Sequence, residues 1–356
     1  MRLGIIGLPQ CGKTTLFNAL TRGTQPTGVT AGRVEVHTGV VDVPDARVDR
    51  LSAMFKPRKT IYAKVTYADI AGLGSSSDKG EIGGALLNQL AQMDGFIHCV
   101  RCFASDAVPH PRGSLDPLRD ARAMDEEFIL NDQISVERKL EKLTEEKKKG
   151  AGRDKALVER EIGLFTRLNE WLAEIRPLRG MDLTEEEEKI ISGFGLLSRK
   201  PLLVVPNLGD DQAAPQLPDF GPRSQVVPLR ARLEMEIAQL PQEEAGVFLA
   251  EYGISEAGLS VMIRASYDLL GLQSFFTVGE DEVRAWTVRR GALAPEAAGV
   301  IHTDMFKGFI RAEVVSYDDL VSLGSLAEAR NKGRLRLEGK TYPVADGDIL
   351  NIRFNI

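Results

Sequence analysis

The stretch GLPQCGKTTLFNAL, residues 7–20, decides the fold of the first part of this chain. It contains the spacing G-x-x-x-x-G-K-[ST], in which glycines let backbone N–H groups turn inward around phosphate oxygens. The residues that satisfy this spacing are Gly7, Gly12, Lys13 and Thr14. The apolar residues Leu3, Ile5 and Ile6 predict a buried strand before the loop, and residues 15–20 begin a helix whose N-terminus faces the anion. Strand, glycine loop and helix together predict a phosphate-binding loop.

Each part of this loop has an expected role in holding a nucleoside triphosphate and Mg²⁺. Backbone N–H groups of residues 8–14 surround the phosphates, Lys13 reaches the β- and γ-phosphates, and the Thr14 hydroxyl binds the metal. We expect Lys13 to be catalytic, because phosphoryl transfer depends mainly on positioning and on stabilising charge at the phosphate oxygens. The residues predicted to bind nucleotide here are Leu8, Pro9, Gln10, Cys11, Gly12, Lys13, Thr14 and Thr15.

A second phosphate-sensing element follows the strand-like segment KVTYADI, residues 64–70. Asp69 and Gly72 form a D-x-x-G pattern, whose aspartate in GTPase-like proteins reaches Mg²⁺ through water while the glycine N–H binds the γ-phosphate. A plain strand-ending turn is the alternative, but the position after a phosphate loop favours Asp69 as a metal ligand and Gly72 as a catalytic residue. Leu73 stands where many GTPases carry the glutamine that orients water. In this chain a backbone group, a cation or a residue of the following loop, 74–84, must therefore orient the attacking water.

The base of the nucleotide is expected to meet a segment much later in the chain. Residues 201–206 predict a short buried strand that ends in Asn207, Leu208 and Asp210. This resembles a guanine-reading N-K-x-D pattern in which the lysine is replaced by Leu208, so recognition of either ATP or GTP stays open. The residues predicted to bind nucleotide at this end of the site are Asn207, Leu208, Asp210, Arg230 and Ala231.

Between these segments the chain predicts a helical hairpin. Apolar residues recur at helical spacing over residues 129–143 and again over 157–175, and a lysine- and glycine-rich break at 147–152 separates them. The lysines at the break predict either a solvated turn or a contact with RNA phosphates, and both interpretations stay open. Thr184 and Glu187 have capping-box spacing and predict a further short helix.

Composition limits the class of protein. The chain has 356 residues, a formal net charge of -6 and 43% hydrophobic residues, which predicts two or three domains and argues against a nucleic-acid-binding surface over the whole chain. Three cysteines form no disulfide framework and suit a reducing compartment. We expect no leader before the phosphate loop, and no apolar run approaches about 18 residues. We therefore expect a soluble, cytoplasmic protein with no membrane or DNA partner; its oligomeric state stays open.

A family resemblance extends almost from end to end. The segments that carry it are GLPQCGKTTLFNAL, GVVDVPDARVDRL, DIAGL, HCVRCF, EVRAWTVRRGALAPEAAGVIHTDMFKGFIRAEV and RLEGKTYPVADGDILNIRFNI. By these segments the chain resembles the YchF-type proteins of the Obg-related class of P-loop nucleotidases.

The resemblance implies an α/β fold in three parts. These are a P-loop nucleotidase domain with a mostly parallel sheet at residues 1–126 and 199–272, an inserted antiparallel helical hairpin at 127–198, and a small β-grasp-like TGS domain at 273–356. It also implies a hydrophobic residue in place of the catalytic glutamine, a preference for ATP over GTP, and association with ribosomes in translation or stress responses.

Several positions depart from the family pattern. Gln10 replaces an asparagine that can bind a monovalent cation, so stimulation by K⁺ stays open. Arg33 stands where the first switch offers a threonine, and Thr30 or Thr38 can substitute, which leaves that metal ligand unassigned. Asp210 replaces the family's glutamate and brings this segment back toward guanine recognition.

The C-terminal block is expected to be a compact β-rich module. Residues 283–288 and 310–315 predict strands, and the turn 346–348 precedes another strand. Residues 330–340, RNKGRLRLEGK, contain five basic residues and one acidic residue. This segment predicts either a contact with ribosomal RNA or an ordinary solvated loop.

The sequence thus predicts a Mg²⁺-dependent nucleoside triphosphatase with slow intrinsic turnover that works as a ribosome-associated factor, with ATP as the favoured substrate. Two alternatives remain. One is a GTP-selective switch that recognises guanine through Asn207 and Asp210. The other is a ribosome- or RNA-binding factor with negligible hydrolysis.

Overall fold

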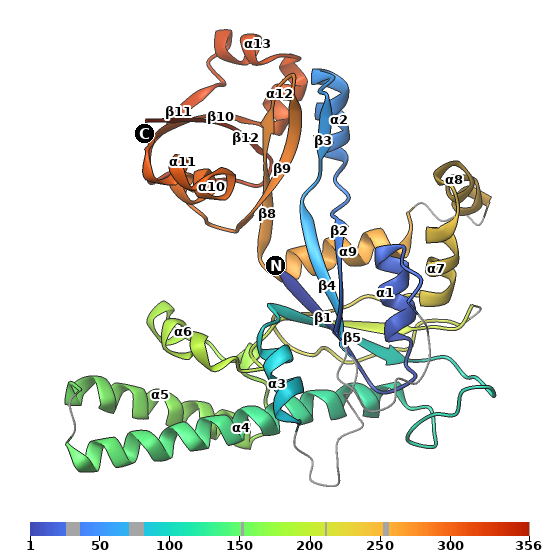
Figure 1. Cartoon of the computed structure of the whole chain (residues 1–356), viewed down its shortest axis with the longest axis vertical. Helices are drawn as coiled ribbons and strands as arrows, with labels where there is room; N and C mark the ends of the chain where they lie inside the picture. Colours follow the sequence, from blue (N-terminus) through green and yellow to red (C-terminus); the bar gives the residue numbers. More distant parts are fainter. Residues whose placement is uncertain (26–35, 71–81, 151–152, 211, 252–255, 356) are drawn as a thin grey trace. The chain divides into compact units, whose positions relative to one another are not determined.

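The computed structural model describes residues 1–25, 36–70, 82–150, 153–210, 212–251 and 256–355 (Figure 1). The chain forms two compact units. The first unit comprises Met1–Gly39 and Thr66–Met262, and the second comprises Val40–Val65 and Ile263–Ile356. Residues 40–65, which the sequence analysis places in the nucleotidase domain, group with the C-terminal residues because their strand β3 (Lys59–Ile61) pairs with a C-terminal strand.

The first unit is built on a sheet with strand order β2-β4-β1-β5-β6-β7. Its strands are β1 (Arg2–Ile6), β2 (Val36–Asp42), β4 (Lys64–Ile70), β5 (Gly95–Arg101), β6 (Leu202–Asn207) and β7 (Ser224–Val226). Strands β4, β1, β5, β6 and β7 pair in parallel, and every residue of β5 and β6 is buried. Strands buried on both faces are continuous apolar runs, as expected in a parallel sheet. The predicted α/β fold with a mostly parallel sheet is confirmed.

Helices follow these strands and cover the sheet. They are α1 (Lys13–Thr21), α3 (Gly84–Ala91) and α7 (Ala231–Gln239). α8 (Gln242–Glu251) follows α7, and α9 (Gly258–Leu269) spans the boundary between the residue ranges of the two units. Leu86 and Leu90 of α3 pack with Phe96 of β5 and Val204 of β6 in one apolar cluster. This cluster holds the carboxyl ends of the central strands in place, where the ligand of such a sheet binds.

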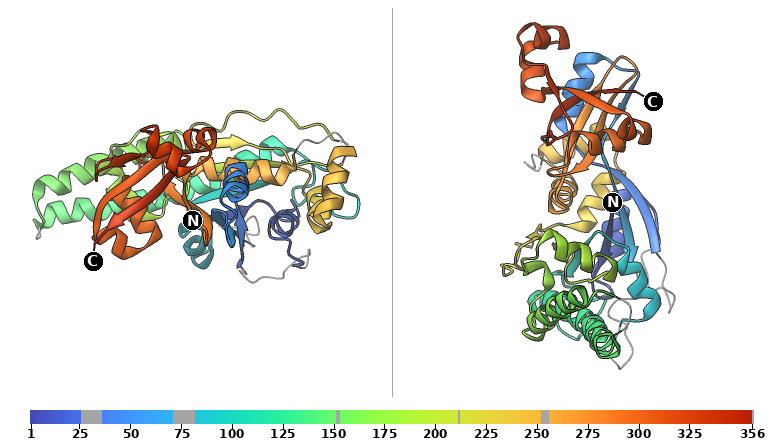
Figure 2. Two further views of the ribbon diagram at one scale, coloured as in Figure 1. Left: turned by 90° about the horizontal axis from the view of Figure 1, so that it is seen from above. Right: turned by 90° about the vertical axis from the view of Figure 1, so that its left-hand side faces the viewer.

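An inserted pair of long helices belongs to the first unit. α4 (Pro117–Lys149) and α5 (Lys155–Ala173) run side by side in Figure 1 and in both views of Figure 2. They share a core of their own that includes Val136, Leu143 and Phe165. The 3₁₀ turns Leu178–Gly180 and Ser192–Phe194 flank α6 (Glu185–Ile191), where Thr184 and Glu187 form the predicted capping box.

Buried polar contacts fasten this hairpin to the rest of the first unit. Asp132 of α4 is 3% exposed and accepts hydrogen bonds from the Leu197 N–H at 2.7 Å, the Ser198 N–H at 2.7 Å and the Ser198 hydroxyl at 2.6 Å. Burial raises the pKa of Asp132 to about 6, although these donors act in the opposite direction. Arg179 and Asp125 form a second buried ion pair. Carboxylates thus fix α4 at two points along its length.

The second unit contains a mixed sheet with strand order β11-β10-β12-β8-β9-β3. Its other strands are β8 (Leu272–Val278), β9 (Glu282–Arg289), β10 (Phe309–Ser316), β11 (Arg336–Glu338) and β12 (Asp348–Phe354), and its helices are α2 (Ala46–Phe55), α10 (Ala294–Ile301), α11 (Thr303–Lys307), α12 (Tyr317–Leu323) and α13 (Leu326–Asn331). Ala294, Ala297 and Ala298 of α10 pack on Phe275 and Val314 of the sheet. Small residues on this helix let its backbone approach the sheet closely.

Each helix in the described part of the chain is too short or too polar to cross a membrane.

Candidate nucleotide site

The phosphate loop joins β1 to α1 and depends on two glycines. Gly7 has φ 144° and Gly12 has φ 99°, both in the region that favours glycine. A Cβ atom at Gly7 would lie 2.3 Å from the Cys99 carbonyl oxygen, and one at Gly12 would lie 2.2 Å from the Asn207 side-chain nitrogen. The loop therefore needs glycine at both positions, for backbone conformation and for space.

Lys13 is positioned by the loop itself. Its Nζ donates hydrogen bonds to the carbonyl oxygens of Gly7 and Leu8, each at 2.9 Å. The ammonium group therefore lies over the loop, and the lysine begins α1, whose N-terminal N–H groups and dipole favour an anion. This arrangement places a cation and a helix N-terminus on the same loop, which suits a nucleotide phosphate.

Thr14 and Asp69 meet although 55 residues separate them along the chain. The Thr14 hydroxyl donates to Asp69 Oδ2 at 2.8 Å, and Asp69 is 5% exposed at the end of β4. Asp69 Oδ1 is buried, and the described residues offer it no hydrogen-bond partner. A hydroxyl and a carboxylate with an unsatisfied oxygen fit Mg²⁺, which prefers oxygen ligands and is commonly held by one or two carboxylates together with substrate phosphates.

Asn207 fastens the phosphate loop to the segment expected to meet the base. Its Nδ2 donates to the Cys11 carbonyl oxygen at 3.0 Å, and its Oδ1 accepts from the Ala231 N–H at 3.1 Å. The side chain is 4% exposed at the end of β6. Both polar ends of Asn207 are therefore used to hold two loops together.

The remaining residues of the base-reading segment lie in different environments. Leu208 packs into the core cluster around β5 and β6, so its side chain does not lie over the loop as the lysine of N-K-x-D would. Asp210 is exposed, and its carbonyl oxygen accepts from Arg230 Nε at 2.7 Å. Arg230 also donates to the Gln212 carbonyl oxygen at 3.1 Å. Arg230 therefore holds the backbone of this segment with its guanidinium group.

Some predicted residues lie outside the described part of the chain. These are Gly72, Leu73, Thr30 and Arg33. Thr38, the other candidate for the first switch, is exposed on β2. The structure thus brings together Lys13, Thr14 and Asp69 at one end of the site.

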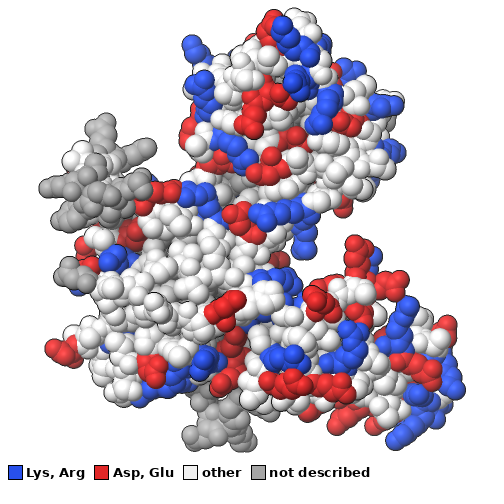
Figure 3. All heavy atoms as spheres, turned by 180° about the vertical axis from the view of Figure 1, so that it is seen from behind, with Lys and Arg blue, Asp and Glu red and all other residues white. Residues whose placement is uncertain are grey.

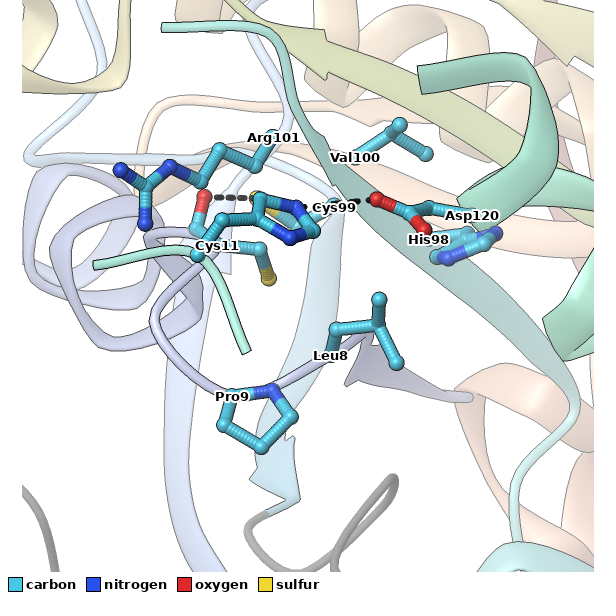
Figure 4. Close-up of a pocket in the computed structure, with 9 residues that line it drawn as sticks. Leu8, Pro9, Cys11, His98, Cys99, Val100, Arg101 and Asp120 are labelled. Atoms are coloured by element: carbon cyan, nitrogen blue, oxygen red, sulfur yellow. Dashed lines mark hydrogen bonds and ion pairs between the residues drawn. The ribbon is translucent and has the colours of Figure 1, made fainter. Parts of the chain in front are cut away.

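A small buried pocket lies behind the phosphate loop (Figure 4). Cys99 Sγ donates to the Cys11 carbonyl oxygen at 3.3 Å in this pocket. Burial alone would raise the pKa of Cys11, but the Cys99 thiol and the Lys13 ammonium outweigh it and lower the pKa to about 7. Burial and the nearby Lys13 cation lower the pKa of His98 to about 3, so this imidazole is neutral. The three cysteines are free thiols, and the described residues contain no cluster of three or more His, Cys, Asp or Glu side chains suited to a metal ion.

The same pocket contains an ionisable pair that the sequence analysis missed. His110 Nε2 lies 3.0 Å from Asp120 Oδ2, and their side chains are 7% and 3% exposed. Asp120 belongs to the first turn of α4 and also accepts from Arg119 Nε at 3.0 Å. No motif links His110 to Asp120, because a loop and a helix start bring them together only in the folded chain.

Comparisons with known proteins agree with this geometry. The family model MMR_HSR1, described as "50S ribosome-binding GTPase", matches residues 2–139, and YchF-GTPase_C, described as "Protein of unknown function (DUF933)", matches residues 272–355. The chain is 40% identical to the "Ribosome-binding ATPase YchF" of Bacillus subtilis (strain 168) over 99% of both chains, and 38% identical to that of Escherichia coli O157:H7 over 100% of this chain and 99% of that one.

A solved structure leads to the same family. The structure of the Schizosaccharomyces pombe YchF GTPase matches with a TM-score of 0.85 and 30% identity, over 99% of this chain and 97% of that chain. The likeness includes both the phosphate-loop unit and the C-terminal module. This chain therefore belongs to the YchF family of P-loop nucleoside triphosphatases.

Proposed function

We propose that this protein is a Mg²⁺-dependent nucleoside triphosphatase that favours ATP and acts in the cytoplasm as a ribosome-associated factor. The observation that carries this proposal is the meeting of Lys13, Thr14 and Asp69 at the phosphate loop. The names of the bacterial relatives, "Ribosome-binding ATPase", support both the reaction and the partner.

The roles of the residues follow from their positions. Lys13 and the loop N–H groups stabilise the charge of the β- and γ-phosphates, and Thr14 and Asp69 hold Mg²⁺. When bound, the metal neutralises charge on the same phosphates. Gly72 is proposed to sense the γ-phosphate through its N–H, as its place in the D-x-x-G pattern suggests.

Water positioning needs a group other than the residue after Gly72, because the Leu73 side chain has neither a donor nor an acceptor. Two histidines line the pocket behind the phosphate loop, His98 and His110. His98 is fully enclosed beside the Lys13 cation, whereas His110 is oriented by the Asp120 carboxylate. The other nitrogen of His110, Nδ1, accepts from the Arg112 N–H at 3.2 Å, so both nitrogens of this imidazole already have a partner. Water positioning is therefore assigned to a backbone group, a cation or a residue of the loop 74–84.

The preference for ATP rests on the base-reading segment. Asn207 is used in loop-to-loop hydrogen bonds, and Leu208 is buried in the core. Neither side chain is therefore available to the base. Asp210 is the remaining residue of the N-K-x-D pattern that could recognise guanine, and it is exposed. The GTP-selective alternative therefore depends on Asp210 alone.

Titration calorimetry with non-hydrolysable ATP and GTP analogues tests this proposal. We expect tighter binding of the ATP analogue in Mg²⁺, weaker binding after Mg²⁺ is removed or after Asp69→Asn, and little effect of Asp210→Ala on ATP. Parallel titrations in K⁺ and in Na⁺ test whether Gln10 supports a monovalent cation. Tighter GTP binding that Asp210→Ala abolishes would instead establish a GTP switch, and failure to bind either nucleotide would contradict the whole assignment.

A further inference from the structure

The second unit contains a hollow of about 620 Å³ at the place where two parallel strands separate. β8 and β12 share one register pair, Phe276 with Ile349. Four consecutive residues of β12, 349–352, line the hollow together with Thr277 and Val278 of β8. Successive residues of a strand point to opposite faces, so a run of them can line one hollow only along the edge of the strand. The hollow therefore opens on the facing edges of β8 and β12.

Past this shared pair, the edge of β12 that faces β8 is free. β12 pairs with β10 along its other edge as far as Phe354, and β8 pairs with β9 along its other edge as far as Val278. On the side toward β8, residues 350–354 of β12 have no ladder partner in the part of the chain that the structure describes. A free strand edge presents backbone N–H and C=O groups, on which an extended peptide can add a strand.

The hollow has apolar walls on both faces of the sheet. On one face Ile301 of α10 and Met305 of α11 pack against the core cluster of this unit. On the other face are Leu326 of α13 and Leu335, because α13 contacts Glu313, whose side chain points away from that cluster. The four apolar side chains are only partly buried. They suit an added strand, whose successive side chains also alternate between the two faces.

The rim of the hollow at the β8–β9 turn is acidic. Glu280, Asp281 and Glu282 line it there, and Asp281 pairs with Arg58 at 3.2 Å. Among the described residues neither Glu280 nor Glu282 forms an ion pair, although Glu282 lies opposite Lys59 in the ladder between β9 and β3. Two carboxylates at this turn are thus available to a cation of a ligand.

The remaining carboxylate of the hollow is already neutralised. Glu313 accepts from Arg330 Nη2 at 3.3 Å, from Arg353 Nη2 at 2.5 Å and from Asn351 Nδ2 at 2.9 Å, and its side chain is 10% exposed. Arg330 also lines the hollow, but its charge is matched by that of Glu313. The excess negative charge of the hollow therefore lies at the β8–β9 turn.

The occupant of this hollow must match a free strand edge, apolar walls on both faces and a negative rim. Nucleic acid does not match, because its phosphates would meet the carboxylates of the turn. We propose that the hollow binds an extended basic segment of a partner protein, which adds a strand to the free edge of β12 and places Lys or Arg against Glu280 and Glu282. The proposal goes beyond nucleotide hydrolysis and does not depend on it.

The glutamates of the helical hairpin offer no comparable site. Near its tip they are paired with cations of the hairpin itself: Glu145 with Lys149, Glu159 with Lys147, and Glu146 and Glu161 with Arg153. Figure 3 shows both signs of charge intermingled along the hairpin. A basic peptide would have to displace these cations, and two helices present no strand edge to it.

Fluorescence anisotropy with the full chain tests the proposal. The probe is a fluorescein-labelled peptide of about eight residues, with lysine and arginine at both ends and valine and leucine between them. The variant Glu280→Gln with Glu282→Gln should bind it about tenfold more weakly at low salt, because two charge pairs are lost. The matched control, Asp268→Asn with Asp318→Asn, removes the same charge from exposed positions outside the hollow and should bind within about twofold of the unchanged protein.

Two modified probes test the addition of a strand. In an added strand the N–H groups of alternate residues face β12, so N-methylation of one alternate set should weaken binding at least about tenfold. N-methylation of the other set should leave binding within about threefold. A peptide with glutamate in place of lysine and arginine should bind at least about tenfold more weakly than the basic probe.

A variant inside the hollow guards against loss of folding. Ala327 is exposed on α13 and lines the hollow, and Lys is also a good helix former. Ala327→Lys should therefore keep the thermal midpoint of the unchanged protein while it weakens binding of the basic probe about threefold by like-charge repulsion.

The outcomes separate the possible occupants. Equal losses in the Glu280 and Glu282 variant and in its control, equal binding of the two methylated peptides, or equal binding of the glutamate peptide would overturn the proposal. Sedimentation of the unchanged protein tests a second copy of this chain as the occupant. A dimer that the basic probe dissociates would establish that occupant and would overturn the proposal as well.

Discussion

Asn207 illustrates how a motif residue can be predicted while its contacts are not. The sequence analysis assigns Asn207 to the nucleotide base, but its carboxamide bonds the Cys11 carbonyl and the Ala231 N–H. Both partners are backbone atoms. Residues of every type carry such atoms, so the sequence does not show which of them Asn207 will bond. The meeting of Thr14 and Asp69 was predictable, because both residues belong to recognised patterns at the ends of strands that become neighbours.

His110 is the side chain whose replacement tests the contacts behind the phosphate loop. Its Nδ1 accepts from the Arg112 N–H at 3.2 Å, and its Nε2 lies 3.0 Å from Asp120 Oδ2. We expect His110→Ala to lower the unfolding free energy by about 1–3 kcal/mol, because it removes the contact between the imidazole and the buried Asp120 carboxylate. Urea unfolding measures the change, and His302→Ala, at a side chain that is 64% exposed in the second unit, is the matched control. A His110→Ala protein as stable as the unchanged chain would contradict this prediction.

His98 predicts a pH dependence of stability. Its pKa is lowered to about 3 in the folded chain, below the ordinary value of 6.5, so folding favours the neutral imidazole. The stabilising contribution is complete above pH 6.5 and is lost as the pH falls from there toward 3. Between pH 7 and pH 5 we expect the unfolding free energy of the unchanged protein to fall by about 2 kcal/mol more than that of His98→Gln. Urea unfolding at both pH values measures the difference, and parallel profiles for the two proteins would disprove it.

Helix α4 connects the phosphate-loop region with the helical hairpin. Its first turn carries Asp120, which lines the pocket behind the phosphate loop, and Asp132 fastens the helix three turns later. The helical periodicity predicted both long helices, and the capping-box spacing predicted α6. The short strand β3 was not predictable from the sequence. It has only three residues and no apolar pattern, and it forms a strand because it pairs with β9.

Replacement of Asp132 tests the attachment of the hairpin. Asp132→Ala leaves the buried N–H groups of Leu197 and Ser198 without an acceptor, and each such group costs about 1–3 kcal/mol. We expect a total loss of about 3 kcal/mol or more in unfolding free energy. Urea unfolding followed by the fluorescence of Trp171 in α5, in chains where Trp286 is replaced by Phe, monitors the hairpin directly. The control Asp182→Ala removes an exposed carboxylate and should change stability by less than about 0.5 kcal/mol. Equal effects of both variants would show that Asp132 is not an anchor.

The distribution of charge over the molecule could be predicted only in part from the composition. A net charge of -6 argues against a basic surface over the whole chain, but it does not reveal the arginines that surround Glu313. Glu313 and these arginines come from β10, α13 and β12, so no single sequence window contains them. The α/β class, the family and the C-terminal module were predictable because long, specific segments carry them.

Single-turnover hydrolysis of γ-labelled ATP in Mg²⁺, with and without ribosomes, tests the central claim most directly. The unchanged protein should hydrolyse ATP slowly alone and faster with ribosomes, and Lys13→Ala should lose at least about 100-fold in rate because it removes a cation aimed at the transferred phosphoryl group. Lys307→Ala, which removes an exposed lysine of the second unit, should match the unchanged protein. Hydrolysis by Lys13→Ala at the unchanged rate, or ATP that stays intact on the unchanged protein even with ribosomes, would contradict the account.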